Sequence, residues 1–311
     1  MTVFAVQAGK YRAEVASTGA GLELVSHDGQ LLTETWQEKP GQKSPISAGL
    51  VLAPWRNRTA DGRYTFDGVD YQLDITEKDR NNANHGFVRT VEWQRTEHDE
   101  DVVSLRTPIG THPGWPHQIV LTATYRVDPV DGLSVTHTAE NVGDARAPFA
   151  LGQHTFIRLG DLPIDDCALQ LAATRVQPLD PERQLPVGDP QPVAGTDMDF
   201  TRPRTLAGRL LDTPFTGLVA DGAVHRNRLF GPHGDCTELW TDLNFGWVQA
   251  FTADPARGQA YPGRGRALAV EPMTSPPNAL ASGIDLITLE PGQTWSGSWG
   301  LRYRPSPDVA R

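Results

Sequence analysis

Short runs of alternating apolar and polar residues recur along this chain and constrain its fold more than any other feature. Most of these runs end at Gly, Asp or Asn, and β-branched and aromatic residues are frequent in them. A two-residue period of this kind is typical of strands joined by tight turns. Because no stretch longer than about ten residues has a convincing helical period, the sequence predicts an all-β protein.

The clearest single element is a hairpin at residues 62–75, in which Asp67-Gly68 is the turn and Tyr64 and Phe66 share one face. Further strands are expected at residues 11–18, 21–29, 30–36, 102–109, 119–127, 133–141, 236–242, 245–253, 267–272, 286–292 and 295–304. Residues 160–215 are rich in Pro and Asp, and we interpret them as long loops. So many short strands suit a large β-sandwich. Without a linker-like change in composition, we expect residues 1–311 to form a single domain.

The overall charge limits the partners that the protein can have. A net charge of −10 over 311 residues disfavours nucleic acid and anionic membranes, although local charge could still bind a small anion. We see no signal peptide and no apolar run of the roughly 20 residues that span a bilayer. Cys167 and Cys236 could pair, but a reduced cytoplasmic protein is the simpler interpretation.

The segment LAVEPMTSPPNAL, residues 268–280, offers one acid in an unusual context. Glu271 follows the apolar run 268–270, and Pro272 comes directly after it. We expect the prolines of this segment to stop regular pairing and to stiffen the backbone. A carboxylate that is held in place and partly desolvated suits a general base. The alternative is a surface acid at the end of a strand.

Four other stretches could carry chemistry, and each also has a plain structural interpretation. Arg58 follows a Pro/Trp turn and could bind sugar hydroxyls or a carboxylate, or lie on an exposed loop. His85 lies beside Gly86 in a turn, 81–89, that allows close approach of a ligand, or it is solvated there. His154 is flanked by apolar strand residues and could be a buried structural imidazole. Asp212 precedes a proline and an aromatic residue, which suits a sugar contact and is equally a common turn.

Motifs for metals and cofactors are absent from the sequence. The nine histidines form no H-x-x-x-H pattern on a helix, and there is no C-x-x-C pair. No glycine-rich phosphate loop opens a helix, and no G-x-S-x-G elbow supports serine hydrolase chemistry. We therefore expect no metal and no cofactor.

Six segments occur in an order that resembles the aldose 1-epimerase (galactose mutarotase) family. They are NRTADGRYTFDG (57–68), NHGFVRTVEW (84–93), GQHTF (152–156), DTPF (212–215), WTDLNFGWVQAFT (240–252) and LAVEPMTSPPNAL (268–280). The segments HGFVR and VEPMTSPPN are similar to those of a bacterial branch of the family that includes proteins associated with sulfoquinovose metabolism.

The resemblance implies a β-sandwich with an open cleft on one face. It also implies roles for six residues: Glu271 as the base, His154 as the general acid, His85 as an aid at the ring oxygen or a hydroxyl, and Arg58, Asp212 and Gln249 as sugar contacts. Such an enzyme interconverts the α and β anomers of a hexose by opening and closing its ring, without a cofactor. We expect a monomer or homodimer.

Three departures from the family pattern concern specificity more than chemistry. Thr59 replaces the usual aliphatic residue after N-R, the segment 152–159 differs from the galactose enzymes, and Arg56 stands where the branch often has proline. If the turn is extended, Arg56 and Arg58 would point the same way, and Arg56 could bind an anionic sugar such as sulfoquinovose or a hexose 6-phosphate.

Two other classes of protein remain as alternatives. A non-catalytic sugar-binding protein could use the same aromatic and polar contacts, but it needs no acid–base pair. A glycosidase usually needs two carboxylates roughly 5–10 Å apart, and the sequence offers one clear acid, Glu271, and one weak one.

Overall fold

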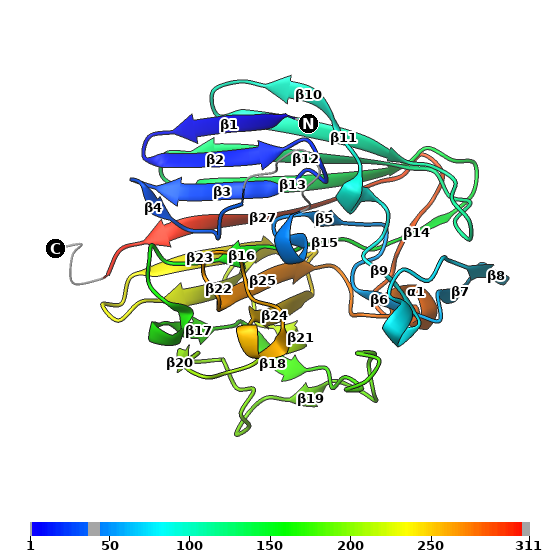
Figure 1. Cartoon of the computed structure of the whole chain (residues 1–311). Helices are drawn as coiled ribbons and strands as arrows, with labels where there is room; N and C mark the ends of the chain where they lie inside the picture. Colours follow the sequence, from blue (N-terminus) through cyan, green and yellow to red (C-terminus); the bar gives the residue numbers. More distant parts are fainter. Residues whose placement is uncertain (1, 37–43, 307–311) are drawn as a thin grey trace.

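Two large antiparallel sheets form the body of the protein and face each other across a common core (Figure 1). The computed structural model describes residues 2–36 and 44–306. In order across the nine-stranded sheet lie β10 (Gln94–His98), β11 (Val102–Ile109), β12 (Ile119–Asp128), β13 (Gly132–Asn141), β27 (Thr294–Arg304), β23 (Cys236–Asp242), β22 (Val224–Phe230), β17 (Ala168–Gln170) and β20 (Arg204–Thr205). The eight-stranded sheet contains β19 (Gln191–Pro192), β18 (Ala173–Val176), β21 (Asp212–Leu218), β24 (Trp247–Ala253), β25 (Ala267–Met273), β15 (Gly152–Gln153) and β5 (Val51–Leu52), and β16 (Phe156–Ile157) pairs with β25.

Smaller sheets and short helices complete the described part of the chain. A four-stranded sheet comprises β1 (Val3–Ala8), β2 (Tyr11–Ala16), β3 (Leu22–His27) and β4 (Gln30–Leu31). Three strand pairs are β14 (Ala147–Phe149) with β26 (Ile287–Leu289), β6 (Arg58–Ala60) with β9 (Asn82–Asn84), and β7 (Arg63–Phe66) with β8 (Val69–Gln72). The helices are α1 (Ala279–Ser282) and the 3-10 turns η1 (Pro45–Ser47), η2 (Lys78–Arg80), η3 (Val88–Thr90), η4 (Ile164–Asp166) and η5 (Pro255–Arg257).

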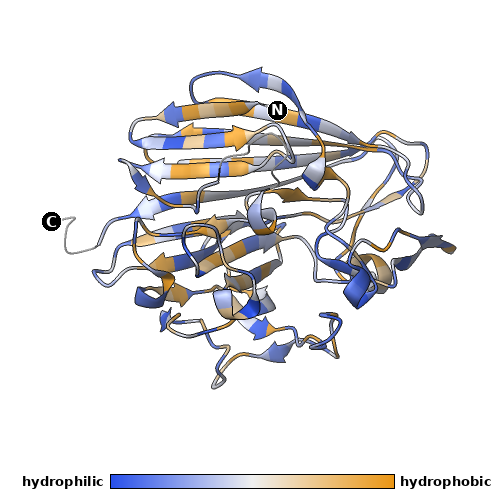
Figure 2. Cartoon of the chain, in the orientation of Figure 1, coloured by the Kyte–Doolittle hydropathy of each residue, from blue (hydrophilic) through white to orange (hydrophobic). Residues whose placement is uncertain are grey.

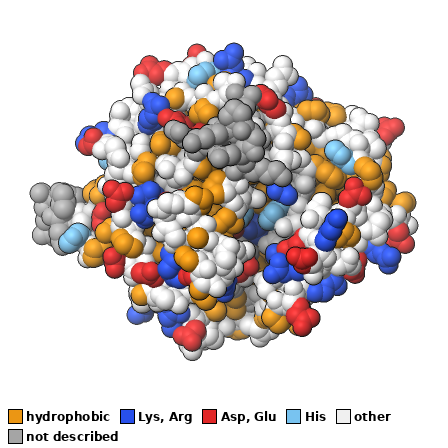
Figure 3. All heavy atoms as spheres, viewed as in Figure 1, with side chains coloured by type: hydrophobic (Ala, Val, Ile, Leu, Met, Phe, Trp, Pro, Cys, Tyr) orange, Lys and Arg blue, Asp and Glu red, His pale blue; other side chains and the backbone are white. Residues whose placement is uncertain are grey.

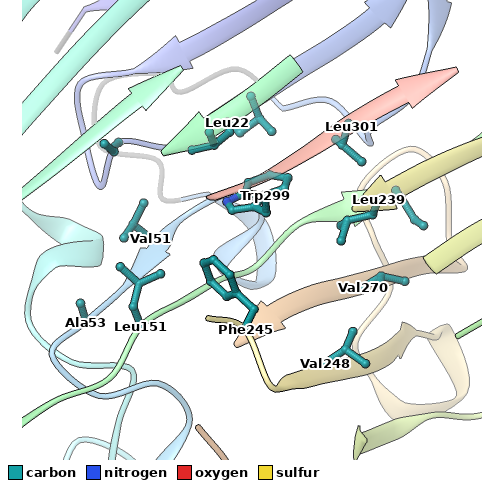
Figure 4. Packing of buried hydrophobic residues seen from close by; sticks show 14 of the residues in the cluster. Leu22, Val51, Ala53, Leu151, Leu239, Phe245, Val248, Val270, Trp299 and Leu301 are labelled. Carbon is teal, nitrogen blue, oxygen red and sulfur yellow. The ribbon is translucent and has the colours of Figure 1, made fainter. Parts of the chain in front are cut away.

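The main core lies between the two large sheets. Val248 of β24 and Val270 of β25 belong to the same buried cluster as Leu239 of β23 and Trp299 of β27 (Figure 4). Apolar residues, coloured orange in Figure 2, recur along the strands of both sheets. Successive strand residues point to opposite faces. Because Val248 faces this core, Gln249 and the residues two positions from it along β24 must face away from it.

A second, smaller apolar cluster covers part of that opposite face. It includes Phe251 of β24 and Ala269 of β25, together with Trp36 and Tyr261 from loops. Every residue of β24 and β25 is buried as a result. Side chains on this face are therefore shielded from bulk water even though they lie outside the main core.

The large β-sandwich predicted from the sequence is confirmed. Strands β11 and β23 have the predicted bounds, and the hairpin with Asp67-Gly68 at its turn is β7 with β8. The sequence analysis missed β1 and β22, and the region 160–215 contains short strands between its loops. The expectation that residues 81–89 form one turn was wrong, because β9 pairs with β6 before the turn at His85.

Two further sequence expectations concern membranes and cysteines. Within the described residues, no helix has the length and apolar character needed to cross a membrane. Cys167 and Cys236 are both buried as free thiols, and burial raises the pKa of each to about 11.

Candidate active site

One row of residues across the eight-stranded sheet builds the centre of the site. The pairing of β24 with β25 places Gln249 directly opposite Glu271. On the other side of β25, the pairs Gly152↔Met273 and Phe156↔Ala269 keep one register, which brings His154 opposite Glu271. Cross-strand neighbours point to the same face of a sheet. The acid, the base and an amide predicted far apart in the sequence therefore lie side by side.

The position of Glu271 corrects one sequence expectation. The strand does not stop at Pro272, because β25 continues to Met273 and Pro272 pairs with Val248 of β24. The N–H groups of Val270 and Thr274 both donate toward the strand that carries His154, at 3.0 and 2.9 Å. Pro272 lies between them and has no N–H to donate. Glu271 is thus fixed inside a fully buried strand, with a side chain 1% exposed.

The backbone of His154 forms hydrogen bonds with residues 49 and 50. Its N–H donates to Leu50 O at 3.0 Å, and its carbonyl accepts from Gly49 N at 2.8 Å. The imidazole is stacked on Phe156 and meets Phe251 edge-on. These contacts leave His154 Nε2 at 3.8 Å from Glu271 Oε1, which is too long for a hydrogen bond but close enough for both groups to reach one ligand.

Arg56 binds the other oxygen of Glu271. Its Nη2 donates to Glu271 Oε2 at 2.6 Å, and its Nη1 donates to Gln249 Oε1 at 3.4 Å. The side chain of Arg56 is 2% exposed. Its stem passes over Gly152, where a Cβ would lie only 2.6 Å from Arg56 Cγ. Arg56 therefore holds one side of the carboxylate, and Glu271 Oε1 accepts no hydrogen bond from any described residue.

The extended turn that would make Arg56 and Arg58 point the same way is not present. Asn57 between them has φ of 61°, so the backbone turns instead of running extended. Arg58 lies in the short strand β6, and its Nε and Nη2 donate to the two oxygens of Glu77 at 2.7 and 2.9 Å. Arg80 donates to the same carboxylate at 2.9 Å. A direct contact of Arg56 with substrate remains a prediction.

His85 enters the site from the turn after β9. Its φ is 65°, and its N–H donates to Asn57 O at 3.0 Å. Gly86 is required next to it, because a Cβ there would lie 2.0 Å from Ala53 O. The ring centroids of His85 and His154 are 6.1 Å apart. Nδ1 of each ring is buried and has no hydrogen-bond partner among the described residues, so neither ring is held in place through that nitrogen.

Asp212 begins β21 on the same face of the sheet. It pairs in register with Phe251, and its Oδ1 accepts a hydrogen bond from Gln249 Nε2 at 2.7 Å. Gln249 thus links Asp212 to Arg56 and, through it, to Glu271. Burial raises the pKa of Asp212, and nearby Glu271 adds to this, while Arg58 and Arg56 oppose it.

A single cavity of about 260 Å³ collects all of these groups. It is lined by every residue that the sequence analysis assigned to the site: Arg56, Arg58, His85, His154, Asp212, Gln249 and Glu271. Figure 3 shows blue and pale-blue side chains, those of Lys, Arg and His, inside a hollow near the centre of this face. The cavity lies just below the range of roughly 300–1,000 Å³ usual for ligand pockets, so it suits a small ligand such as one sugar ring.

Burial favours neutral histidines in this cavity. Desolvation lowers the pKa of His154, with Arg56 adding to the effect and the carboxylate of Glu271 opposing it. Desolvation also lowers the pKa of His85 well below its ordinary value, helped by His154 and Arg56. The imidazolium of His154 is consequently a stronger acid than in water, with Glu271 as the group that favours its formation.

The sequence analysis missed Arg89, which lines the same cavity from η3. Arg89 is half-buried, and desolvation lowers its pKa. Its side chain has no hydrogen bond or ion pair with any described residue, whereas Arg56, Arg58 and Arg80 each bind a carboxylate. Its position four residues after His85, in a segment already identified, was the only signal in the sequence.

The described residues contain no group of three His, Cys, Asp or Glu side chains that could hold a metal ion. The donor set of the cavity fits this finding, since one oxygen of Glu271 already binds Arg56 and the described partners of Glu77 are two arginines and an asparagine. The polar groups that face the cavity are instead suited to hydroxyl groups and to proton transfer.

Comparison with known proteins places this arrangement in a family. The sequence matches the Aldose 1-epimerase family over residues 2–302. It is 31% identical over 286 residues to the uncharacterized protein YihR of Escherichia coli (strain K12), covering 92% of this chain and 88% of that protein. It is also 31% identical over 175 residues to galactose mutarotase of Rattus norvegicus, covering 54% of this chain and 49% of that protein.

Solved structures agree on the fold. The GalM/aldose epimerase homologue from C. elegans superimposes with a TM-score of 0.84 at 18% identity, covering 97% of this chain and 98% of that chain. Together with the match over residues 2–302, this means that the chain belongs to the aldose 1-epimerase family.

Proposed function

We propose that this protein is an aldose 1-epimerase that interconverts the α and β anomers of a hexose. The observation that carries the proposal is the pair formed by Glu271 Oε1 and His154 Nε2, which lie 3.8 Å apart and line one small cavity. Opening a hexose ring needs one group that removes the proton from the C1 hydroxyl and one that protonates the ring oxygen. C1 and the ring oxygen are bonded to each other, so the two groups must lie as close together as these do.

The proposed reaction uses only side chains of this chain. The carboxylate of Glu271 takes the proton of the C1 hydroxyl, and protonated His154 gives its proton to the ring oxygen as the C1–O5 bond breaks. The open aldehyde rotates about C1–C2, and the same two groups reverse their roles as the ring closes. Arg56 stabilises the ionised form of Glu271 between turnovers.

The remaining cavity groups suit the sugar hydroxyls. Asp212 and Arg58 can accept and donate hydrogen bonds at the ring edge, and His85, which lines the same cavity, can contact a hydroxyl or the ring oxygen. A non-catalytic sugar-binding protein would need these contacts as well, but it would have no use for a base whose second oxygen lacks a hydrogen bond.

The test is NMR exchange spectroscopy on equilibrated reducing sugars, which reports anomer exchange directly. We expect the protein to accelerate exchange of at least one hexose and the Glu271→Gln variant to lose this effect while it stays folded. Binding of hexoses without any acceleration of exchange would instead favour the sugar-binding alternative.

Arg89 supports a more specific candidate, a hexose with an anionic group at C6. Four arginines line the cavity against three carboxyl groups, and Arg89 is the one without a described partner. Pairing a partly dry guanidinium with a phosphate or sulfonate could contribute on the order of 1.5–3 kcal/mol. Arg56 gives this candidate less support than the sequence suggested, because its guanidinium binds Glu271.

Comparing glucose, galactose, glucose 6-phosphate and sulfoquinovose on the wild type and on Arg89→Met tests this candidate. A preference for the anionic sugars that Arg89→Met abolishes would support it, and equal rates on neutral and anionic sugars would contradict it. We also expect a cytoplasmic monomer or homodimer, which cell fractionation and light scattering would check.

A further inference from the structure

Glu77 lines the catalytic cavity, but nothing in the proposed reaction uses it. It is a third carboxyl group in that cavity, beside Glu271 and Asp212. Its side chain is 18% exposed, so it is neither a fully buried acid nor a solvated surface one. A carboxylate in such a place can bind the sugar, act as a second base, or orient another side chain that does the binding. The hydrogen bonds of its two oxygens distinguish these roles.

Each oxygen of Glu77 accepts two hydrogen bonds. Oε1 accepts from Arg58 Nη2 and from Arg80 Nη1, both at 2.9 Å. Oε2 accepts from Arg58 Nε at 2.7 Å and from Asn82 Nδ2 at 3.3 Å. A carboxylate has about four acceptor sites, so these four donors occupy it. Glu77 is therefore suited neither to bind a sugar hydroxyl nor to take a proton from one.

The same donors keep Glu77 ionised. Burial raises the pKa of Glu77, but the hydrogen bonds and the charge of Arg58, with hydrogen bonds from Asn82 and Arg80, outweigh burial and hold this pKa below its ordinary value. An ionised carboxylate can bind a guanidinium through two parallel N–H···O bonds, which fix the plane of the guanidinium as well as its distance. The pair of Glu77 with Arg58 has this two-bond form.

The guanidinium of Arg58 is held so that part of it stays available. Nε and Nη2 donate to Glu77, and Nη1 donates to Asn57 Oδ1 at 3.1 Å. An arginine has five N–H donors, so these three bonds leave one hydrogen on Nη1 and one on Nη2. Arg58 lines the catalytic cavity, and its charge lowers the pKa of Asp212 there. The two remaining N–H groups are thus the part of Arg58 that a ligand in the cavity can use.

The backbone fixes the same two residues. Glu77 N–H donates to Asn82 O at 2.9 Å, and Asn82 N–H donates to Glu77 O at 3.1 Å, which forms a bridge. Asn82 belongs to β9, and β9 pairs with β6, the strand that carries Arg58. On the outer side, Arg80 Nε donates to Glu182 O at 3.0 Å. Glu77 cannot move relative to Arg58 without breaking several of these bonds.

We propose that Glu77 is a positioning residue, which orients the guanidinium of Arg58 so that its remaining N–H groups are fixed for a hydroxyl group of the sugar. The sugar contact in this inference rests on the proposed epimerase function. A donor that is already oriented loses less conformational freedom when the sugar binds. A contact that is equally strong in the bound sugar and in the transition state changes KM and leaves kcat unaltered. Loss of Glu77 should therefore appear in KM.

The kinetic test measures kcat and KM of anomer exchange for the wild type, Glu77→Gln, Arg58→Met and the double variant. The sugars are glucose, galactose, glucose 6-phosphate and sulfoquinovose. In Glu77→Gln an NH2 group replaces one of the oxygens that the guanidinium needs, so we expect KM to rise about tenfold with kcat within about twofold. The double variant should be no worse than Arg58→Met alone, because Glu77 acts through Arg58.

Asp61→Asn is the matched control for the kinetic test. Asp61 forms an ion pair with Arg183 at 2.8 Å but does not line the catalytic cavity, so its replacement should leave KM unchanged. An unchanged KM in Glu77→Gln would overturn the proposal while the epimerase function stands. The same conclusion would follow if the losses in Glu77→Gln and Arg58→Met multiplied in the double variant, or if Glu77→Gln lowered kcat alone, as a structural defect would.

Heteronuclear NMR of the arginine Nε–H groups tests the orienting role without any reaction. The signal of Arg58 is assigned by its loss in Arg58→Met. We expect this Nε–H to be rigid and to exchange slowly with water in the wild type, and we expect Glu77→Gln, but not Asp61→Asn, to abolish the slow exchange. A mobile Arg58 in the wild type, or an unchanged signal in Glu77→Gln, would overturn the proposal. If the signal responds as expected but no sugar exchanges, the epimerase function is wrong and the orienting of Arg58 by Glu77 is supported.

Discussion

Two buried glutamates in this protein have opposite surroundings. Glu238, on β23 of the nine-stranded sheet, accepts hydrogen bonds from Arg226, Arg228 and Arg302 at 2.6–2.9 Å. Glu271, on β25 of the eight-stranded sheet, accepts one from Arg56 on Oε2. Both side chains are 1% exposed, so burial alone does not distinguish them.

The difference follows from the residues that lie opposite each glutamate on the neighbouring strands. The neighbours of Glu238 in register are Arg228 on β22 and Arg302 on β27, so each oxygen finds a guanidinium. The neighbours of Glu271 are Gln249 and His154, which leave Oε1 without a described hydrogen bond. A fully paired buried carboxylate is a structural element, whereas one with a free oxygen beside an imidazole can accept a proton from a ligand.

The largest expected effect separates the two glutamates by activity. Glu271→Gln removes the proposed base and keeps the shape, so catalysed anomer exchange should fall roughly 10²–10⁴-fold. Because it leaves the buried Arg56 without its carboxylate, it should also lower the free energy of unfolding, by about 3 kcal/mol. Glu238→Gln should keep exchange near the wild-type rate and lower the free energy of unfolding by about 3 kcal/mol, because it removes the carboxylate that three arginines share and leaves Arg228 without an ion pair to a described residue. NMR exchange and urea unfolding measure the two quantities. Near-normal exchange in Glu271→Gln would end the assignment of the base.

The same comparison extends to histidines on the two sheets. His154→Asn removes the proposed proton donor and should lower exchange by a factor comparable to Glu271→Gln, while His85→Asn should cost less because its proposed hydrogen bond to the sugar is supporting. His225, a buried histidine of β22 that lies 3.2 Å from Thr241 Oγ1, is the control. Its replacement by Asn should leave exchange unchanged, and a loss equal to that of His154→Asn would show that the assay reports folding instead of chemistry.

The pH dependence of stability should separate histidines from Glu238. Burial lowers the pKa of His137 to about 4, below an ordinary value of 6.5. The contribution of neutral His137 to the free energy of unfolding is complete above pH 6.5. It is lost as the pH falls toward 4, by about 3 kcal/mol. His85 and His154, whose pKa values are also lowered, act in the same direction. Unfolding free energies measured from pH 8 to pH 4 should show this decline.

Glu238 should contribute to the pH dependence only at lower pH. Its arginine partners hold its pKa below the ordinary 4.5 despite burial, so its contribution is present above pH 4.5 and is lost as the pH falls through the lowered value. The stability difference between wild type and Glu238→Gln should therefore be constant above pH 4.5 and shrink below it. A difference that shrinks already near pH 6 would contradict this account.

Replacing Arg56 should have a smaller effect on rate. Arg56→Met keeps an apolar stem over Gly152 and removes the donor to Glu271 Oε2, so the carboxylate loses the hydrogen bond that fixes its position. We expect a loss of about tenfold in kcat/KM. NMR exchange measures this loss, and exchange at the wild-type rate would contradict the role of Arg56.

Chelation should have no effect on rate. The proposed chemistry uses side chains alone, so dialysis against EDTA should leave anomer exchange at the wild-type rate. Loss of activity that one divalent ion restores would overturn the proposed mechanism.

Local patterns in the sequence were enough to predict much of the fold. The alternation in VVSLRTPI and CTELWTD predicted β11 and β23 within their bounds, because each strand pairs over its whole length with regular neighbours. The N-terminal strand β1 shows the same alternation, with Phe4 and Val6 buried, and could have been found in the same way. The expectation of a single domain stays a prediction.

Contacts between distant segments decided what the sequence could not show. Arg56 and Glu271 are 215 residues apart, so no local pattern connects them. Pro272 was expected to end its strand, but the strand continues through it. The position of Pro272 lies between the hydrogen bonds of Val270 and Thr274, beside His154, where the pairing does not need an N–H donor. The partners of Arg58 and the lack of a described partner for Arg89 are likewise properties of the folded chain.

The tight fit of Arg56 over Gly152 has a consequence for which substitutions this site tolerates. Any side chain at position 152 would collide with the stem of the arginine, and the nearby Pro272 carbonyl at 3.1 Å leaves no other room. A larger residue at 152 would therefore displace Arg56 from its place beside Glu271. The dependence runs in one direction only: Arg56 can be replaced while Gly152 stays, but Gly152 cannot be replaced without moving Arg56.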